Sequence, residues 1–166
     1  MKRLFAAVCI IMLSLPVLAQ DGASVKIYKS RNPGEQGLGI IEFIAQVSSR
    51  DRVTCGDALN FFVMVIGREP GSFDENKAAL KTAGIDAELG MGENDPVRKG
   101  DVALMAAEYL KLGDLAMYAI FKTKRYAFRA CVANGIMDYA GSEWDRMSGA
   151  ELIEVMNRVS RRAESK

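Results

Sequence analysis

The sequence predicts an all-α protein built from repeated helical hairpins. Apolar side chains recur at helical spacing over much of the 166-residue chain. Strand signals are few. A short pattern typical of a helix start occurs three times, at intervals of about 45 to 50 residues, which is the length of a two-helix repeat.

The first 19 residues have the features of a secretory signal peptide. Residues 1–3 are basic, residues 4–15 are apolar, and Val17 and Ala19 stand at the −3 and −1 positions ahead of Gln20. The apolar run is short for a membrane anchor, which needs roughly 20 apolar residues. We therefore expect cleavage after Ala19, no transmembrane segment afterwards, and an exported protein that is periplasmic or associated with the cell envelope.

The charge and the absence of histidine exclude several classes of function. The formal net charge is +1, and it becomes −1 without Lys2 and Arg3, so no basic footprint for nucleic acid is expected. A chain with no histidine cannot form an imidazole zinc site, a Ser-His-Asp triad or a Cys-His pair. No cofactor fingerprint is present either. We expect no metal, no cofactor and no enzymatic activity.

Two cysteines remain after the predicted cleavage, Cys55 and Cys131. An even number of cysteines in an exported protein favours a disulfide. The alternative is a pair of buried free thiols that pack as small apolar side chains. Their spacing in the sequence does not decide between the two.

The first elements follow from apolar spacing and turn residues. Residues 20–39 are expected to be irregular, with a turn at 32–34 and a short strand at 25–28 as one option. The helical domain is expected to span 40–166. It begins with a short helix or strand at 40–47.

The remaining elements are expected to be helices. Residues 55–66 are apolar almost all round, which is typical of a buried helix. Ser72 or Asp74 can cap the next helix, and Gly84 can end it. Later helices are expected at 98–112, within 114–134 and at 148–162.

The acids of the repeated pattern are expected to cap helices. Thr54 with Asp57, and Ser148 with Glu151, have the spacing of a capping box. In the middle copy only Asp101 stands at the equivalent N3 position, where the helix dipole favours an acid. Catalytic carboxylates are normally paired on convergent elements, whereas these acids are spread one to a repeat. We therefore interpret them as structural.

The pattern around these caps resembles the S-layer homology domain over about residues 40–162. That family has a Gly-Ile helix end, a loop with Gly and aromatic residues, and Ile-Thr-Arg-Ala-Glu at the next helix start. The last copy here carries Gly-Ile at 135–136, then Tyr139, Gly141 and Trp144, then Met-Ser-Gly-Ala-Glu at 147–151. The middle copy carries Gly-Ile at 84–85 and Val-Arg-Lys-Gly-Asp at 97–101.

The resemblance implies a pseudo-threefold cluster of helical hairpins that attaches to cell-wall polysaccharide. In the family, the basic residue of the helix-start motif contributes to a site for an anionic polymer. The matching positions here are Cys55, Lys99 and Gly149, so only Lys99 keeps a cation. The partner is therefore expected to be either a wall polymer or, with no glycan involved, another protein of an envelope complex.

The candidate binding residues are cations and loop aromatics. They are Arg98, Lys99, Lys122, Lys124, Arg125, Tyr139 and Trp144. An exposed Trp and Tyr can stack on a sugar ring or anchor a protein partner. A single Trp more often packs back onto the core, and we expect this for Trp144. The acidic stretch 93–95 is expected to be a solvated loop, since it lacks the alternating ligands of an EF-hand.

Overall fold

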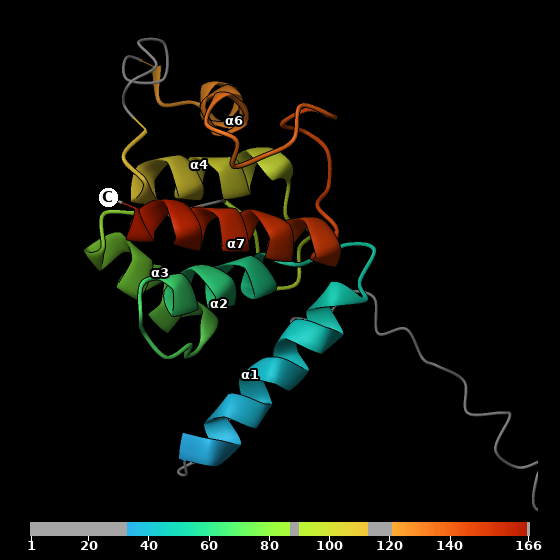
Figure 1. The fold of residues 1–166 in the computed structure, drawn as a ribbon, viewed down its shortest axis with the longest axis vertical. Helices are drawn as coiled ribbons and strands as arrows, with labels where there is room; N and C mark the ends of the chain where they lie inside the picture. The colour runs from blue at the N-terminus through green and yellow to red at the C-terminus, as the bar shows by residue number, and fades with distance from the viewer. Residues whose placement is uncertain (1–32, 87–89, 113–120, 166) are drawn as a thin grey trace, which may run out of the picture.

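A computed structural model describes residues 33–86, 90–112 and 121–165, and it is helical (Figure 1). The helices are α1 (Pro33–Ser48), α2 (Cys55–Val65), α3 (Phe73–Thr82), α4 (Lys99–Tyr109), α6 (Lys124–Ala133) and α7 (Gly149–Glu164). Within the described ranges, β pairing is limited to two isolated bridges. The all-α prediction is therefore confirmed. The expected signal peptide and the optional strand at 25–28 lie outside the described residues.

Helix α1 begins earlier than the apolar spacing of its residues predicts. It starts at Pro33, inside the segment expected to be irregular. Proline has no amide hydrogen to lose and suits the first position of a helix, so the chain from Pro33 forms a helix where a turn was expected. Figure 1 shows α1 running away from the other helices. Its C-terminal end is anchored by Phe43 and Val47, which are buried, and α1 packs against α7.

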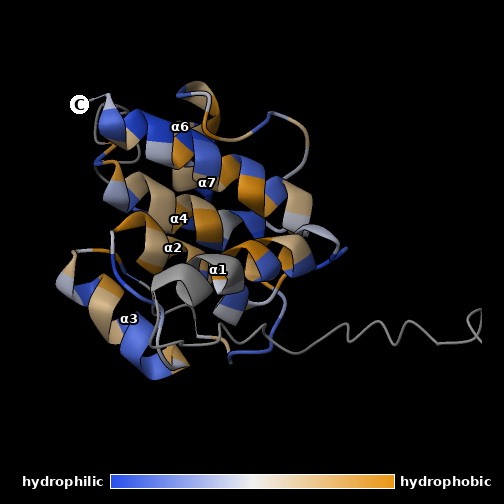
Figure 2. Cartoon of the chain, turned by 60° about the horizontal axis from the view of Figure 1, so that its bottom comes forward, coloured by the Kyte–Doolittle hydropathy of each residue, from blue (hydrophilic) through white to orange (hydrophobic). Residues whose placement is uncertain are grey.

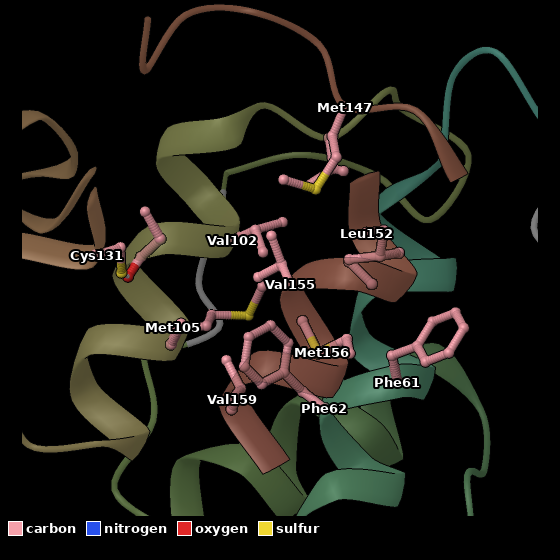
Figure 3. Close-up of a cluster of buried hydrophobic side chains, with 14 of the residues drawn as sticks. Phe61, Phe62, Val102, Met105, Cys131, Met147, Leu152, Val155, Met156 and Val159 are labelled. Carbon is pink, nitrogen blue, oxygen red and sulfur yellow. Dashed lines mark hydrogen bonds between the residues drawn. The ribbon is translucent and has the colours of Figure 1, made fainter. Parts of the chain in front are cut away.

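The core lies between α2, α4 and α7. Figure 3 shows side chains of these three helices pointing toward one another. In α2, every residue from Cys55 to Val63 is buried. In α7, the buried apolar residues form a single stripe: Leu152, Val155, Met156 and Val159. Helix α6 covers α4, and α3 covers α2.

The polarity of the helices matches this arrangement. In Figure 2, α3 and α7 carry both hydrophilic and hydrophobic residues. Helices α2 and α4 are mostly hydrophobic in the same view, as expected for helices that neighbours cover on several sides. None of the described helices has both the length and the apolarity needed to cross a lipid bilayer.

Three segments far apart in the chain meet in a closed cycle of backbone hydrogen bonds. The amide of Val53 donates to the carbonyl of Met147 at 3.0 Å, and the amide of Val97 donates to Val53 at 3.0 Å. The amide of Met147 donates to Val97 at 3.3 Å, which closes the cycle. All three residues are buried. We call these three residues the central ring, and each of them stands directly before the N-cap residue of α2, α4 or α7.

The first amide of each of these helices also bonds across the ring. Each donates to a carbonyl in the loop that precedes another of the three helices: Cys55 to Asp95 at 2.8 Å, Lys99 to Asp145 at 2.8 Å and Gly149 to Arg50 at 2.9 Å. The first amides of a helix have no partner within it. These bonds supply the partners, and they hold the three helix starts together at one end of the molecule.

Candidate functional site

The start of α2 is a buried ionic network. The Thr54 hydroxyl accepts from the amide of Asp57, and the Asp57 carboxylate accepts from the amide of Thr54 at 3.1 Å, so both halves of the capping box are present. Asp57 is fully buried, and the guanidinium of Arg50 lies 2.9 Å from its Oδ2. A buried carboxylate needs such compensation. The structure gives Asp57 a structural role.

The starts of α7 and α4 also have a capping acid that is paired with a cation. Ser148 and Glu151 form a complete capping box, and the Lys99 ammonium lies 2.7 Å from Glu151. At α4 the N-cap side chain is a cation and cannot accept, so only Asp101 caps, by accepting from the Arg98 amide at 3.2 Å.

The second oxygen of the buried Asp101 carboxylate faces a lysine. The ammonium of Lys124 lies 2.5 Å from Asp101 Oδ1. This oxygen has no hydrogen bond of good geometry, so the contact is best regarded as an ion pair. Lys99 and Lys124, two of the predicted ligand-binding cations, are therefore engaged in holding the helix starts. Their charges are already compensated within the protein.

Trp144 does not pack onto the core as expected. Its side chain is 66% exposed, and the Arg98 guanidinium lies 5.4 Å from the ring centroid. The cause is local: the carboxylate of Asp145 accepts from the Ser142 amide at 2.8 Å, which closes a tight turn at the surface. A cation over an indole face gains up to about 1 kcal/mol at an exposed site. This pair forms an ordered, flat and positively charged surface.

The other predicted aromatic lies beside this turn. Tyr139 is 89% exposed, and it lines a broad hollow of about 800 Å³ together with Phe128, Arg129 and Gly141. Gly141 has a φ of +104°, and a side chain there would lie 3.2 Å from the Lys99 ammonium. The loop that carries Tyr139 and Trp144 therefore approaches the start of α4 closely.

Two predicted cations lie apart from this surface. Lys122 and Arg125 are exposed near the start of α6. Lys122 interacts electrostatically with Glu108. Among the described residues, no contact joins either of them to Trp144. The structure thus brings together Arg98, Lys99, Lys124 and the loop aromatics, but not the whole predicted set.

A small hollow of about 130 Å³ between α6 and α7 contains several charges, all of them paired. Arg158 bonds to Asp138 at 2.9 Å and also to Glu154, while Lys99 bonds to Glu151. Burial raises the pKa of Glu151, but the hydrogen bonds from Lys99 and Ser148 together outweigh it and leave that pKa below its ordinary value. A general acid working near neutral pH needs the opposite shift.

The acidic stretch 93–95 forms a turn. The Asp95 carboxylate accepts from the Gly92 amide at 2.8 Å, which closes the turn. Within the part of the chain that the structure describes, no three cysteine or acidic side chains converge where a metal ion could bind.

Of the two alternatives left open for the cysteines, the structure has the pair of buried free thiols and not the disulfide. Cys55 and Cys131 are both free and buried. Cys55 begins α2, whereas the thiol of Cys131, on α6, donates to the carbonyl of Ala103 on α4 at 3.4 Å (Figure 3). Burial raises the pKa of each thiol to about 12, so neither is a ready nucleophile.

Two functional candidates were missed in the sequence. Arg52 and Arg146 line a hollow of about 380 Å³ beside the central ring. The signal that could have found them is positional, because each stands directly before a central-ring residue, Val53 or Met147. Arg50, the partner of Asp57, was also missed, since its contact depends on how the chain turns back after α1.

Comparison with known protein families, curated proteins and solved structures finds no match to this chain. The resemblance to the S-layer homology domain therefore rests on the motifs quoted above.

Proposed function

We propose that this protein is an exported, non-enzymatic module of the cell envelope that attaches to cell-wall polysaccharide. Export rests on the basic and apolar start of the chain and on the small residue before the expected cleavage site. The scaffold would be the cluster of helices that begin around the central ring.

The observation that carries the proposal is the exposed indole of Trp144 with the Arg98 guanidinium over its ring. A flat aromatic surface at the protein surface suits the apolar face of a sugar ring. The adjacent cation suits a polymer that carries negative charge. Tyr139, on the same loop, is a second exposed aromatic side chain that a sugar could contact.

The test is co-sedimentation of the purified protein with cell-wall sacculi that keep or lack their secondary polymers. We expect pelleting that depends on the polymer and that falls when Trp144 is changed to alanine. Phe121→Ala is the matched control, because Phe121 is also an exposed aromatic residue but stacks on Tyr126, away from the loop. Equal pelleting of the two variants would rule out the indole surface as the attachment site.

A second candidate function is that of an adaptor within an envelope protein complex, with no glycan involved. It is favoured by α1, where Ile40 and Ile41 are exposed although both are large and apolar. Retention in the supernatant with both kinds of sacculi would favour this function. A photo-crosslinking residue at position 41 should then capture a protein partner, and one at the polar, exposed position Gln46 should not.

A further inference from the structure

The hollow beside the central ring has an excess of positive charge. It is lined by Asp51, Arg52, Val53, Thr54, Asn94, Pro96 and Arg146. Arg52 and Arg146 are both exposed, and within the described residues neither forms an ion pair. Asp51 is the one acid in the lining. The side chains around the hollow therefore have a net charge of about +1 at neutral pH.

This situation differs from that of the other cations near the helix starts. Arg50, Lys99 and Lys124 each lie within 3 Å of a carboxylate of the capping acids. The two arginines of the hollow have no such partner among the described residues. Arg52 and Arg146 line the same hollow, and like charges repel, so an anion bound between them would offset this repulsion.

The backbone that carries these arginines is rigid. Arg52 precedes Val53 and Arg146 precedes Met147, and the Val53 amide donates to the Met147 carbonyl at 3.0 Å. This bond joins two segments that are far apart in the sequence, so the backbone that carries Arg52 and Arg146 is held beside the hollow. A site whose backbone is already held loses little backbone freedom when a ligand binds.

Among the residues that line the hollow, Pro96 has no amide N–H, and the amides of Val53 and Thr54 are already used. Those of Val53 and Val97 donate within the central ring, and that of Thr54 donates to the Asp57 carboxylate. We therefore assign recognition in the hollow mainly to the side chains of Arg52 and Arg146. Guanidinium groups bind the paired oxygens of carboxylates and phosphates through parallel N–H donors.

We propose that this hollow binds a singly charged oxyanion, a carboxylate or a phosphodiester, between Arg52 and Arg146. The single charge follows from Asp51, which offsets one of the two cations. The site is distinct from the surface of Trp144, and it does not depend on wall attachment.

The test is a titration of the whole protein with dimethyl phosphate and with acetate at constant ionic strength, using chloride as the reference ion. The side-chain Nε–H signals of the arginines are followed by NMR. We expect saturable shifts confined to Arg52 and Arg146, and the anion that binds more tightly identifies the group. Shifts that match those in chloride with both anions would overturn the proposal.

Substitutions locate the site. Arg52→Gln and Arg146→Gln should each weaken binding by roughly tenfold, since each removes charge-assisted hydrogen bonds. Arg125→Gln, an exposed cation on α6, should leave binding unchanged. Arg98→Gln, whose guanidinium lies on Trp144, should change it by less than about twofold. Equal losses in Arg52→Gln and Arg125→Gln would show non-specific attraction only.

The test of oxyanion binding in the hollow can fail or succeed independently of the test of wall attachment. Trp144→Ala should abolish wall attachment and leave oxyanion binding intact. Saturable binding by a protein that stays in the supernatant with all sacculi would support the hollow and reject wall attachment. Far-UV circular dichroism of each variant verifies that the helices are retained.

Discussion

At the start of α2 the capping acid Asp57 is fully buried, whereas at the start of α7 the capping acid Glu151 has a side chain that is 44% exposed. Both acids complete a capping box, and both pair with a cation. Arg50, the partner of Asp57, is largely buried, and so is Lys99, the partner of Glu151. The two sites therefore differ mainly in how much water reaches the acid.

The same capping motif can therefore make very different contributions to the free energy of unfolding. Breaking a buried ion pair costs about 3–5 kcal/mol, because one charge is left without a partner in a region of low polarity. An exposed pair contributes about 0–1 kcal/mol, because water competes for both charges. The first residues of the two helices also differ. Both are buried, but Cys55 carries a side chain at α2, while at α7 the carbonyl of Val47 lies where a side chain of residue 149 would be.

The largest expected effect is that of Asp57→Ala. It leaves the Arg50 guanidinium and the Thr54 amide without their partner, so the free energy of unfolding should fall by about 3 kcal/mol. Urea unfolding followed by circular dichroism measures this. Asp74→Ala is the control, since Asp74 is an exposed acid in the first turn of α3 and should cost at most about 1 kcal/mol. Equal losses of unfolding free energy in Asp57→Ala and Asp74→Ala would contradict the role of burial.

Gly149→Ala should come next. An added Cβ would lie 1.7 Å from the carbonyl oxygen of Val47, so α1 and α7 would have to separate. Overpacking of this kind typically costs about 1–3 kcal/mol. Gly100→Ala is a graded comparison, because its Cβ would lie 2.8 Å from the Glu143 carbonyl oxygen and should cost less. A Gly149→Ala protein as stable as wild type would show that this contact is looser than described.

Glu151→Ala should have a smaller effect, of about 1 kcal/mol, because the acid is partly exposed. The same unfolding experiment measures it. Ser148→Ala removes the other half of the same capping box, so the two losses should not add in the double variant. Full additivity would indicate that the two side chains act independently.

The pH dependence of α7 should be the smallest effect. The pKa of Glu151 lies below its ordinary value of 4.5 in the folded protein, so its charged form favours folding. This contribution is present above the ordinary pKa and is lost as the pH falls through the folded pKa. The stability difference between wild type and Glu151→Gln should therefore shrink as the pH is lowered from 7 through the folded pKa of Glu151, which lies below 4.5. A stability difference that does not change with pH would contradict the lowered pKa of Glu151.

Much of the fold could be predicted because its determinants are local. The spacing of Thr54 and Asp57 predicts a capping box, and the structure has one there. The buried stripe of α7 could be predicted from the helical spacing of its apolar residues. The start of α1 was misplaced because Pro33 suits both a turn and the first turn of a helix, and local propensity does not separate these.

The candidate site was less predictable. Trp144 was expected in the core because apolar area favours burial, but the turn closed by Asp145 presents it to solvent. Lys99 was expected to face a ligand, yet it meets Glu151, which lies far away in the sequence. Cys55 and Cys131 could have formed a disulfide by number alone, and only their positions on α2 and α6 exclude it.

The order of residues was therefore sufficient to predict helices, their ends and their caps, because these depend on neighbours within about four positions along the chain. The closed cycle of Val53, Val97 and Met147 required the folded chain, since its hydrogen bonds join segments dozens of residues apart. The same folding sets which cations are compensated and which, like Arg52 and Arg146, surround a hollow. Long-range contacts depend on the packing of the whole core, and that information is not contained in any one stretch of residues.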